Sequence, residues 1–231
     1  MYLRGEWVAG ATKEIYKRFT YQCEMQNGKP VRRRRKEKSN PTPEAVQKYN
    51  RQLRERRLIR KANANFAKGD LYLTLTYPRE HRPSPEKARK DVENFRVCLR
   101  RKYRKAGQEM KWIACTEIGS RGGIHHHMLL NQYDDVREIA ELWERYGGYA
   151  HIQFVRGNNL AKLALYIAKN EYSCSRNLID PPERMKKVKA NSWRDDPVVP
   201  AGWMLDKDSL VTGINPVTGH GYQFYRLVQL E

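Results

Sequence analysis

The order of strand-like and helix-like patterns in the central part of this chain constrains its fold more than any other feature. Residues 71–77 alternate apolar and polar side chains and are followed by Pro78, which predicts a strand. Ser84 and Pro85 then suit the start of a helix, whose narrow apolar stripe continues until Gly107. The apolar period therefore changes from two to about 3.6 residues within one short segment, which is typical of a mixed sheet-and-helix domain.

The same alternation of patterns continues toward residue 178. A glycine-rich loop over residues 119–123 separates two further strand patterns and suits an antiparallel hairpin. The elements predicted after Gly107 are strands over residues 111–118, 124–131 and 149–155 and helices over residues 136–146 and after Asn158 or Asn159. The order βαββαβα predicts an α+β fold: a four- to five-stranded, mainly antiparallel sheet of the ferredoxin-like or RNA-recognition kind, with helices packed on one face.

The two ends of the chain lack such clear patterns. We therefore predict a central domain over residues 66–178, a basic N-terminal extension over residues 1–65 and a C-terminal extension over residues 179–231 that packs on the core. The N-terminal extension is expected to be a strand or arm followed by a helix capped by Thr42. In the C-terminal extension only residues 221–230 look like a strand.

Positive charge dominates the composition. The chain has 45 lysines and arginines against 26 acidic residues, a net charge of +19, so a polyanion such as nucleic acid is the first partner to consider. The charge is densest over residues 29–60, where Arg32, Arg33, Arg34 and Arg35 begin a like-charge run that we interpret as a mobile arm. The alternative interpretation is a solvated helix face and linker, without phosphate contacts.

Several classes of protein are excluded by what the chain lacks. No apolar run approaches the roughly 18 residues of a transmembrane helix, and the first residues do not resemble a signal peptide, so we expect a cytoplasmic protein with no membrane partner. The four cysteines include no CxxC pair, which favours buried thiols over a zinc knuckle or disulfides. No GxxxxGK[ST] phosphate loop occurs, so no ATP motor and no small-molecule substrate are predicted.

A run of three histidines is the first candidate for chemistry. On a strand, His125 and His127 point to one face and His126 to the other. The Cβ atoms of the outer pair would lie about 6.5 to 7 Å apart, so both imidazoles can reach one metal ion. Glu117, at the end of the preceding strand, can join them as a carboxylate ligand; this set suits Mg²⁺ or Mn²⁺ and also accepts Zn²⁺ or Ni²⁺. The alternative is a surface run of histidines with no role.

A second candidate lies on the last predicted helix. Tyr166 and Lys169 are three residues apart and therefore occupy neighbouring parts of one helix surface. A tyrosine can attack a polarised phosphate, and the lysine can stabilise the charge on the phosphate or the phenolate. Alone, the pair is more typical of helix packing with a lysine that reaches solvent. Tyr172 is a second candidate nucleophile, but on a regular helix it would be rotated about 120° from Tyr166.

These elements together resemble the HUH endonucleases, the metal-dependent nickases that include rolling-circle replication initiators, relaxases and single-strand transposases. Residues 73–77 (LTLTY) resemble the first initiator motif, residues 125–127 the His-hydrophobic-His metal motif and residues 166–169 (YIAK) the Tyr-x-x-Lys nucleophile motif. The tracts at residues 69–70 (GD) and 175–178 (SRNL) look like those of bacterial phage and plasmid initiators. The resemblance covers about residues 66 to 178, and it departs from the family pattern at His126, where a hydrophobic residue is usual.

The resemblance implies a rolling-circle replication initiator that nicks and rejoins single-stranded or hairpin origin DNA. It implies Tyr166 as the nucleophile, with a 5′-phosphotyrosine adduct and a free 3′-OH as products, and Glu117, His125 and His127 as ligands of Mg²⁺ or Mn²⁺. Lys169 would assist Tyr166. A host polymerase would extend the 3′-OH, and a host helicase or DNA supercoiling would supply the unwinding.

DNA contacts are expected at Arg32 to Arg35 and at Arg121, in the loop before the histidines. Three other classes of function stay open. Relaxases and transposases share the same chemistry. A noncatalytic RNA-recognition-like module would use Tyr72, Trp112 and Phe154 as stacking platforms. An unrelated metallohydrolase with an HxH motif would turn over without a covalent protein–DNA species.

Overall fold

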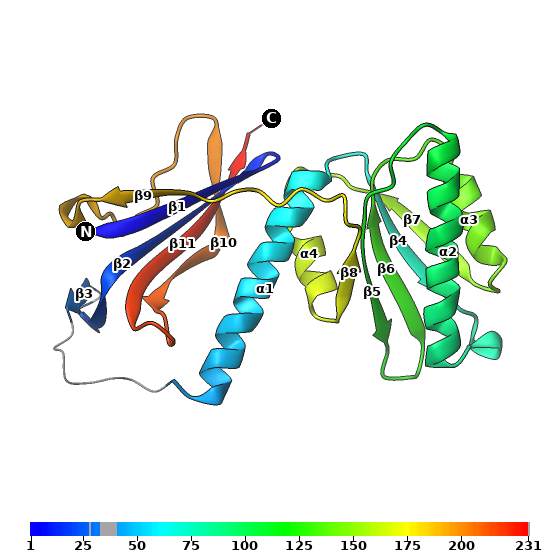
Figure 1. Ribbon diagram of the computed structural model, residues 1–231, viewed down its shortest axis with the longest axis horizontal. Coiled ribbons are helices and arrows are strands. Elements are labelled where there is room, and N and C mark those ends of the chain that lie inside the picture. The colour runs from blue at the N-terminus through cyan, green and yellow to red at the C-terminus, as the bar shows by residue number, and fades with distance from the viewer. Residues whose placement is uncertain (28, 33–40, 231) are drawn as a thin grey trace. The chain divides into compact units, whose positions relative to one another are not determined.

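The computed structural model describes residues 1–27, 29–32 and 41–230 (Figure 1). The chain forms two compact units, one of residues 61–179 and one in which residues 1–60 and 180–231 come together. Arg33, Arg34 and Arg35 of the predicted arm lie outside the described residues. No helix in the described ranges combines the length and apolarity needed to cross a bilayer.

The unit of residues 61–179 is built on a five-stranded antiparallel sheet with the order β7-β4-β6-β5-β8. The strands are β4 (Leu71–Thr76), β5 (Trp112–Ile118), β6 (Ile124–Leu130), β7 (Tyr149–Phe154) and β8 (Tyr172–Cys174). The helices are α2 (Pro85–Lys105), α3 (Val136–Glu144) and α4 (Ala161–Ala168), with a 3-10 turn η1 (Arg79–His81). The first four strands lie in the order fourth, first, third, second, which is the ferredoxin-like arrangement, so the α+β fold predicted from the sequence is confirmed.

The core of this unit lies between the sheet and the pair α2 and α3. Leu71, Leu73 and Leu75 of β4 are fully buried there because alternate residues of a strand share a face. They pack with α2 and α3 side chains that include Phe95, Leu99, Tyr103, Ile139, Leu142 and Trp143. Helix α2 begins as predicted: the Ser84 side chain accepts a hydrogen bond from the Lys87 amide at 3.2 Å.

One close approach holds α3 against the end of β4. The Trp143 indole Nε1 donates to the Thr76 carbonyl oxygen at 3.1 Å. Gly148 lies directly beside this hydrogen bond, and a Cβ atom at this position would collide with both Trp143 Nε1 and the Thr76 oxygen. Glycine is therefore required at this position by the packing.

Helix α4 does not share the face of α2 and α3, contrary to the single helical face that we predicted. His126 of β6 faces the core, where its ring lies edge-on to Trp143. Its neighbour His127 therefore faces the opposite side of the sheet, and Tyr166 of α4 contacts it there. Figure 1 shows α2 and α3 on one side of the sheet and α4 on the other. The face opposite the core is thus covered only in part, by α4.

The second unit is a six-stranded antiparallel sheet with the path β10-β11-β2-β1-β9, in which β3 pairs with β2. Its strands are β1 (Tyr2–Ala9), β2 (Thr12–Gln26), β3 (Lys29–Arg32), β9 (Arg184–Val188), β10 (Trp203–Ile214) and β11 (His220–Gln229), with a 3-10 turn η2 (Ala190–Ser192). Strand β1 pairs with β9, and β2 pairs with β11. The two ends of the chain, which the sequence treats as separate extensions, therefore form one sheet together.

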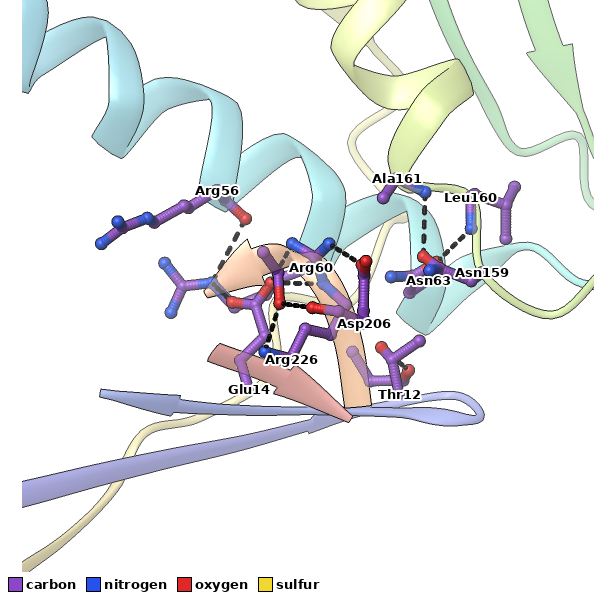
Figure 2. A network of polar contacts seen from close by, with 12 residues as sticks. Thr12, Glu14, Arg56, Arg60, Asn63, Asn159, Leu160, Ala161, Asp206 and Arg226 are labelled. Atoms are coloured by element: carbon purple, nitrogen blue, oxygen red, sulfur yellow. Dashed lines mark hydrogen bonds and ion pairs between the residues drawn. The ribbon is translucent and has the colours of Figure 1, made fainter. Parts of the chain in front are cut away.

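Helix α1 (Pro43–Asn65) begins as predicted, with the Thr42 hydroxyl accepting from the Ala45 amide at 3.2 Å. Figure 2 shows how its basic residues meet the sheet of the second unit. Glu14, whose side chain is only 2% exposed, accepts from Arg226 Nε and Nη2 at 3.1 and 2.8 Å and lies 3.3 Å from Arg60 Nε.

A second arginine of α1, Arg56, lies over the Phe224 ring at 3.9 Å from its centroid. This cation–π contact adds to the ion pair between Arg60 and Glu14. The two arginines belong to the basic stretch that we interpreted as solvated or phosphate-binding. In the structure these two pack α1 onto the sheet of its own unit, while Lys48, Arg51, Arg54 and Arg57 extend away from the buried ion pair.

The opposite face of β2 carries a buried lysine. Lys17 Nζ donates to Gln223 Oε1 at 2.7 Å and to the Arg194 carbonyl at 3.1 Å, and its side chain lies between the rings of Trp193 and Tyr225. Burial disfavours the charged ammonium and lowers the pKa of Lys17 to about 8. The charge of Lys17 is therefore a cost to this unit at neutral pH.

Candidate active site

Strand register brings the predicted site residues onto one face of the sheet. Glu117 of β5 lies directly opposite His125 of β6, and His127 lies opposite Thr74 of β4. The hairpin between β5 and β6 closes as predicted, with the Gly119 amide donating to the Gly123 carbonyl at 2.8 Å. Because side chains alternate along each strand, the short loop is enough to place the carboxylate beside the two imidazoles.

Three of the predicted site residues meet at one point. The Tyr166 hydroxyl donates to Glu117 Oε2 at 2.7 Å and lies 3.3 Å from His127 Nε2. The Glu117 Oε2 and His127 Nε2 atoms are 3.4 Å apart. The rings of Tyr166 and His127 are perpendicular, with centroids 4.9 Å apart. A phenol, a carboxylate and an imidazole therefore converge, although they are up to 49 residues apart in the chain.

The environment of this cluster keeps its groups in defined protonation states. The hydrogen bond to the Glu117 carboxylate, helped by burial, raises the pKa of Tyr166 to about 12. Burial lowers the pKa of His127, an effect that the nearby Glu117 charge opposes. At neutral pH the phenol is thus protonated and the His127 imidazole is neutral, with a lone pair available on one nitrogen.

Two side chains that we did not predict as metal or catalytic residues orient His127 from below. The Tyr72 hydroxyl lies 3.2 Å from His127 Nδ1, and the Thr74 hydroxyl lies 3.4 Å from the same atom. Oxygen atoms on this side favour the tautomer with the proton on Nδ1, which leaves Nε2 free toward Glu117. The signal was present in the sequence, because Tyr72 and Thr74 alternate with the buried leucines of β4 and so face the same side as His127.

His125 shares this face but does not complete the cluster. Its ring centroid is 6.4 Å from that of His127. Its Nε2 atom lies 3.1 Å from the position that a Cβ atom on Gly123 would take, toward the hairpin loop. Within the described residues, no group of three His, Cys, Asp or Glu side chains is gathered closely enough to hold a metal ion. The donor set fits a divalent cation at two positions, Glu117 Oε2 and His127 Nε2, with His125 as a neighbour on the same face.

His126, where the sequence departs from the family pattern, lies behind the sheet in the core. Its Nδ1 atom is 2.8 Å from the Thr116 hydroxyl, and its Nε2 atom is 3.4 Å from the Tyr77 hydroxyl. Burial lowers its pKa to about 4, so the ring is neutral. A polar ring is tolerated at this position because both nitrogens have hydroxyl partners.

The remaining residues of the predicted nucleophile motif lie at the end of α4. Lys169 follows the last helical residue, and its exposed ammonium is 5.4 Å from the centroid of the Tyr166 ring. Tyr172 is not on this helix, so its predicted helical rotation is wrong. The helix ends at Ala168, and Tyr172 lies in β8 opposite Cys115.

The predicted DNA-binding arginines lie at different places. Arg121 is exposed in the hairpin loop between β5 and β6, and its carbonyl accepts from Arg82 Nη1 at 2.7 Å. Arg32 is exposed at the end of β3, in the other unit, with its guanidinium 6.0 Å from the centroid of the Tyr21 ring. Arg33 to Arg35 lie outside the described residues.

Comparison with known families agrees with this geometry. Residues 70–171 match a family model of replication-associated proteins of the ORF2 type. The matched segment runs from the residue before β4 to the residue before β8 and so contains Glu117, His125, His127, Tyr166 and Lys169. No curated protein and no solved structure matches the chain.

The fold and the match together define a replication-associated protein. The central segment of the chain belongs to this family of replication-associated proteins, and this confirms the resemblance to replication initiators at the level of the family.

Proposed function

We propose that this chain is a rolling-circle replication initiator that nicks single-stranded DNA, or a hairpin at an origin, through Tyr166. The observation that carries the proposal is the convergence of the Tyr166 hydroxyl on Glu117 Oε2 at 2.7 Å and His127 Nε2 at 3.3 Å. The family match supports a replication initiator role. The net charge of +19 supports DNA as the partner.

Glu117 and His127, with His125 beside them, are the residues that would hold Mg²⁺ or Mn²⁺. Such an ion, when bound, supplies a positive charge that polarises the scissile phosphate. His127 is suited to this role because its Nδ1 atom faces the hydroxyls of Tyr72 and Thr74, which leaves Nε2 as the ligating atom.

The chain's own residues account for the covalent step. A bond forms between the Tyr166 oxygen and phosphorus, and the bond between phosphorus and the 3′ oxygen breaks. The phenolic proton leaves Tyr166, and one proton ends on the released 3′ oxygen, so the products are a 5′-phosphotyrosine and a free 3′-OH. The Glu117 carboxylate already accepts the phenolic hydrogen bond and is the first acceptor for that proton.

The step is reversible, because no water is consumed and the phosphodiester is exchanged for another one. Lys169, whose ammonium lies near the Tyr166 ring, stabilises negative charge as it develops on the phenolic oxygen or the phosphate. A 3′-OH that returns to the site can attack the phosphotyrosine and rejoin the strand. The free 3′-OH of the nicked strand would prime a host polymerase, with a host helicase to unwind the duplex.

The test is a denaturing gel of the full chain mixed with a pool of labelled single-stranded hairpin oligonucleotides and Mn²⁺. We expect a slower labelled band that resists detergent and is absent with Tyr166→Phe or with EDTA. Tyr172→Phe is the matched control and should still form the adduct, because Tyr172 lies in β8 and not beside His127 on α4.

Two results would contradict the proposal. An adduct that persists in Tyr166→Phe and disappears in Tyr172→Phe would transfer the role of nucleophile to Tyr172. A shift on native gels without an adduct under any divalent metal would favour a noncatalytic DNA-binding module of the same fold.

A further inference from the structure

A hollow of about 620 Å³ adjoins the candidate active site on the side of the hairpin loop. It lies between the segment around η1 and the loop that joins β5 to β6. The residues that line it are Arg79, Arg82, Gly119, Ser120, Arg121, Gly123 and His125. Three arginines and a histidine thus surround one space, and no aspartate or glutamate is among these described lining residues.

The hollow is organised by contacts across its two walls. Arg82 Nη1 donates to the Arg121 carbonyl at 2.7 Å, which ties the η1 segment to the hairpin loop. The space above Gly123 is where two nitrogen donors approach one another. A Cβ atom placed on Gly123 would lie 3.1 Å from His125 Nε2 and 3.7 Å from Arg82 Nη2. The absence of a side chain at Gly123 therefore leaves room for a small ligand beside both donors.

The chemistry of this hollow matches a phosphate group. Guanidinium groups bind phosphate oxygens through two parallel N–H donors, and arginine is the preferred residue for this geometry. The three arginines are exposed at their tips, so they remain charged and solvated until an anion arrives. With no carboxylate in the lining to compensate them, the arginines give the hollow a net charge of about +3 near neutral pH.

The position of the hollow relates it to the candidate site. His125 lines the hollow, and its direct cross-strand partner is Glu117, which accepts the Tyr166 hydrogen bond. A ligand in the hollow is thus one strand pair away from the place where Tyr166 would meet its phosphate. Two anionic positions separated in this way suit neighbouring phosphates of one DNA backbone, rather than an isolated inorganic anion.

We propose that Arg79, Arg82 and Arg121 form a binding site for a backbone phosphate of single-stranded DNA, next to the phosphate attacked by Tyr166. This inference rests on the proposed function for the identity of the strand. The site does not read bases. It holds the strand in register so that the scissile phosphate is presented to Tyr166, as phosphate contacts position nucleic acids in general.

The test measures DNA binding without cleavage. In a Tyr166→Phe background with EDTA, binding of a fluorescent mixed-sequence single strand of about 16 nucleotides is measured at several salt concentrations. The variant is Arg79→Gln with Arg82→Gln. The matched control is Arg101→Gln with Arg137→Gln, which removes the same charge from exposed positions outside the lining.

Each phosphate contact on a single strand contributes about 0.7 to the slope of log affinity against log salt. Loss of one contact in Arg79→Gln/Arg82→Gln should reduce the slope by about 0.7, so the deficit in affinity grows about fivefold for each tenfold decrease in salt. The control pair should keep the parent slope. Gly123→Ala, which puts a methyl group against His125 Nε2, should also weaken binding, whereas Gly157→Ala, with nothing within 4 Å, should not.

Equal slopes for the parent and the Arg79/Arg82 variant would overturn the inference, and so would an equal loss in the control pair, which would indicate unspecific charge. The outcome is independent of nicking. A chain that forms the adduct but keeps its slope in the variant loses only this site. A chain that forms no adduct but shows the reduced slope keeps the phosphate site and loses the proposed nickase activity.

Discussion

Removing one hydroxyl beneath His127 tests whether this histidine is a metal ligand. Tyr72→Phe deletes the oxygen that lies 3.2 Å from His127 Nδ1 and keeps the ring, which is stacked 6.0 Å from the imidazole. Loss of such an orienting partner costs about 10- to 100-fold in metal affinity. Because the Thr74 hydroxyl remains at 3.4 Å, we expect about a tenfold loss, or about 1.4 kcal/mol. With Thr74→Val added, the loss should approach 100-fold.

The assay is a calorimetric titration of the full chain with Mn²⁺ in the absence of DNA. Tyr77→Phe is the matched control, since it deletes the same hydroxyl 3.4 Å from His126 Nε2 on the buried side of the sheet. This control should leave Mn²⁺ affinity unchanged. If Tyr72→Phe binds Mn²⁺ as tightly as the parent, or if the two variants lose affinity equally, His127 is not held for metal binding by its Nδ1 partners and the reasoning fails.

Three further predictions concern stability. Glu14→Gln leaves two buried arginines without a counter-charge and should cost about 3 to 5 kcal/mol in urea unfolding, whereas Glu6→Gln, in partly exposed ion pairs, should cost less than about 1 kcal/mol; similar costs would refute the buried pair. Gly148→Ala should lower the melting temperature by several degrees, because its methyl group displaces the indole from the end of β4, and Gly157→Ala should not; equal melting temperatures would refute this packing. The pKa of Lys17 in the folded chain, about 8, is below its unfolded value, so its contribution to stability is lost as pH falls. Relative to Lys17→Met, the parent should therefore gain about 2 to 3 kcal/mol from about pH 7 to about pH 10, and a flat difference would contradict the burial of this charge.

Much of the central unit could be predicted because its signals are local. The alternation in β4 and the cap at Ser84 each depend on a few neighbouring residues, and both elements occur where the pattern predicts them. The opposite directions of His126 and His127 follow from the same rule of alternation. His126 enters the core and His127 faces Tyr166, as strand geometry requires.

The unit formed by the chain termini could not be predicted in the same way. Strand β2 (Thr12–Gln26) carries charged residues on both faces, such as Glu14 and Lys17, so its hydrophobic pattern is weak. These charges are buried by partners that lie more than 200 residues away, Arg226 and Gln223. No local pattern in the sequence identifies such partners, because only the paired state satisfies these groups.

The end of α4 shows the same limit at the candidate site. Continuing the helix through Tyr172 was compatible with the local sequence. The chain leaves the helix after Ala168 because residues 172–174 pair with β5 as an edge strand. A contact with a strand more than 50 residues earlier decided the position of Tyr172.

The sequence by itself therefore determined the α+β class, the order of the central elements, and which side chains of each strand share a face. The tertiary structure alone decided that Tyr166 meets Glu117 and His127, that His125 turns toward the arginine-lined hollow, and that the two termini form one sheet. The physical reason is the range of the interactions. Periodicity and capping act between neighbours in the chain, whereas strand register and helix packing bring together groups whose spacing in the sequence carries no information about their distance.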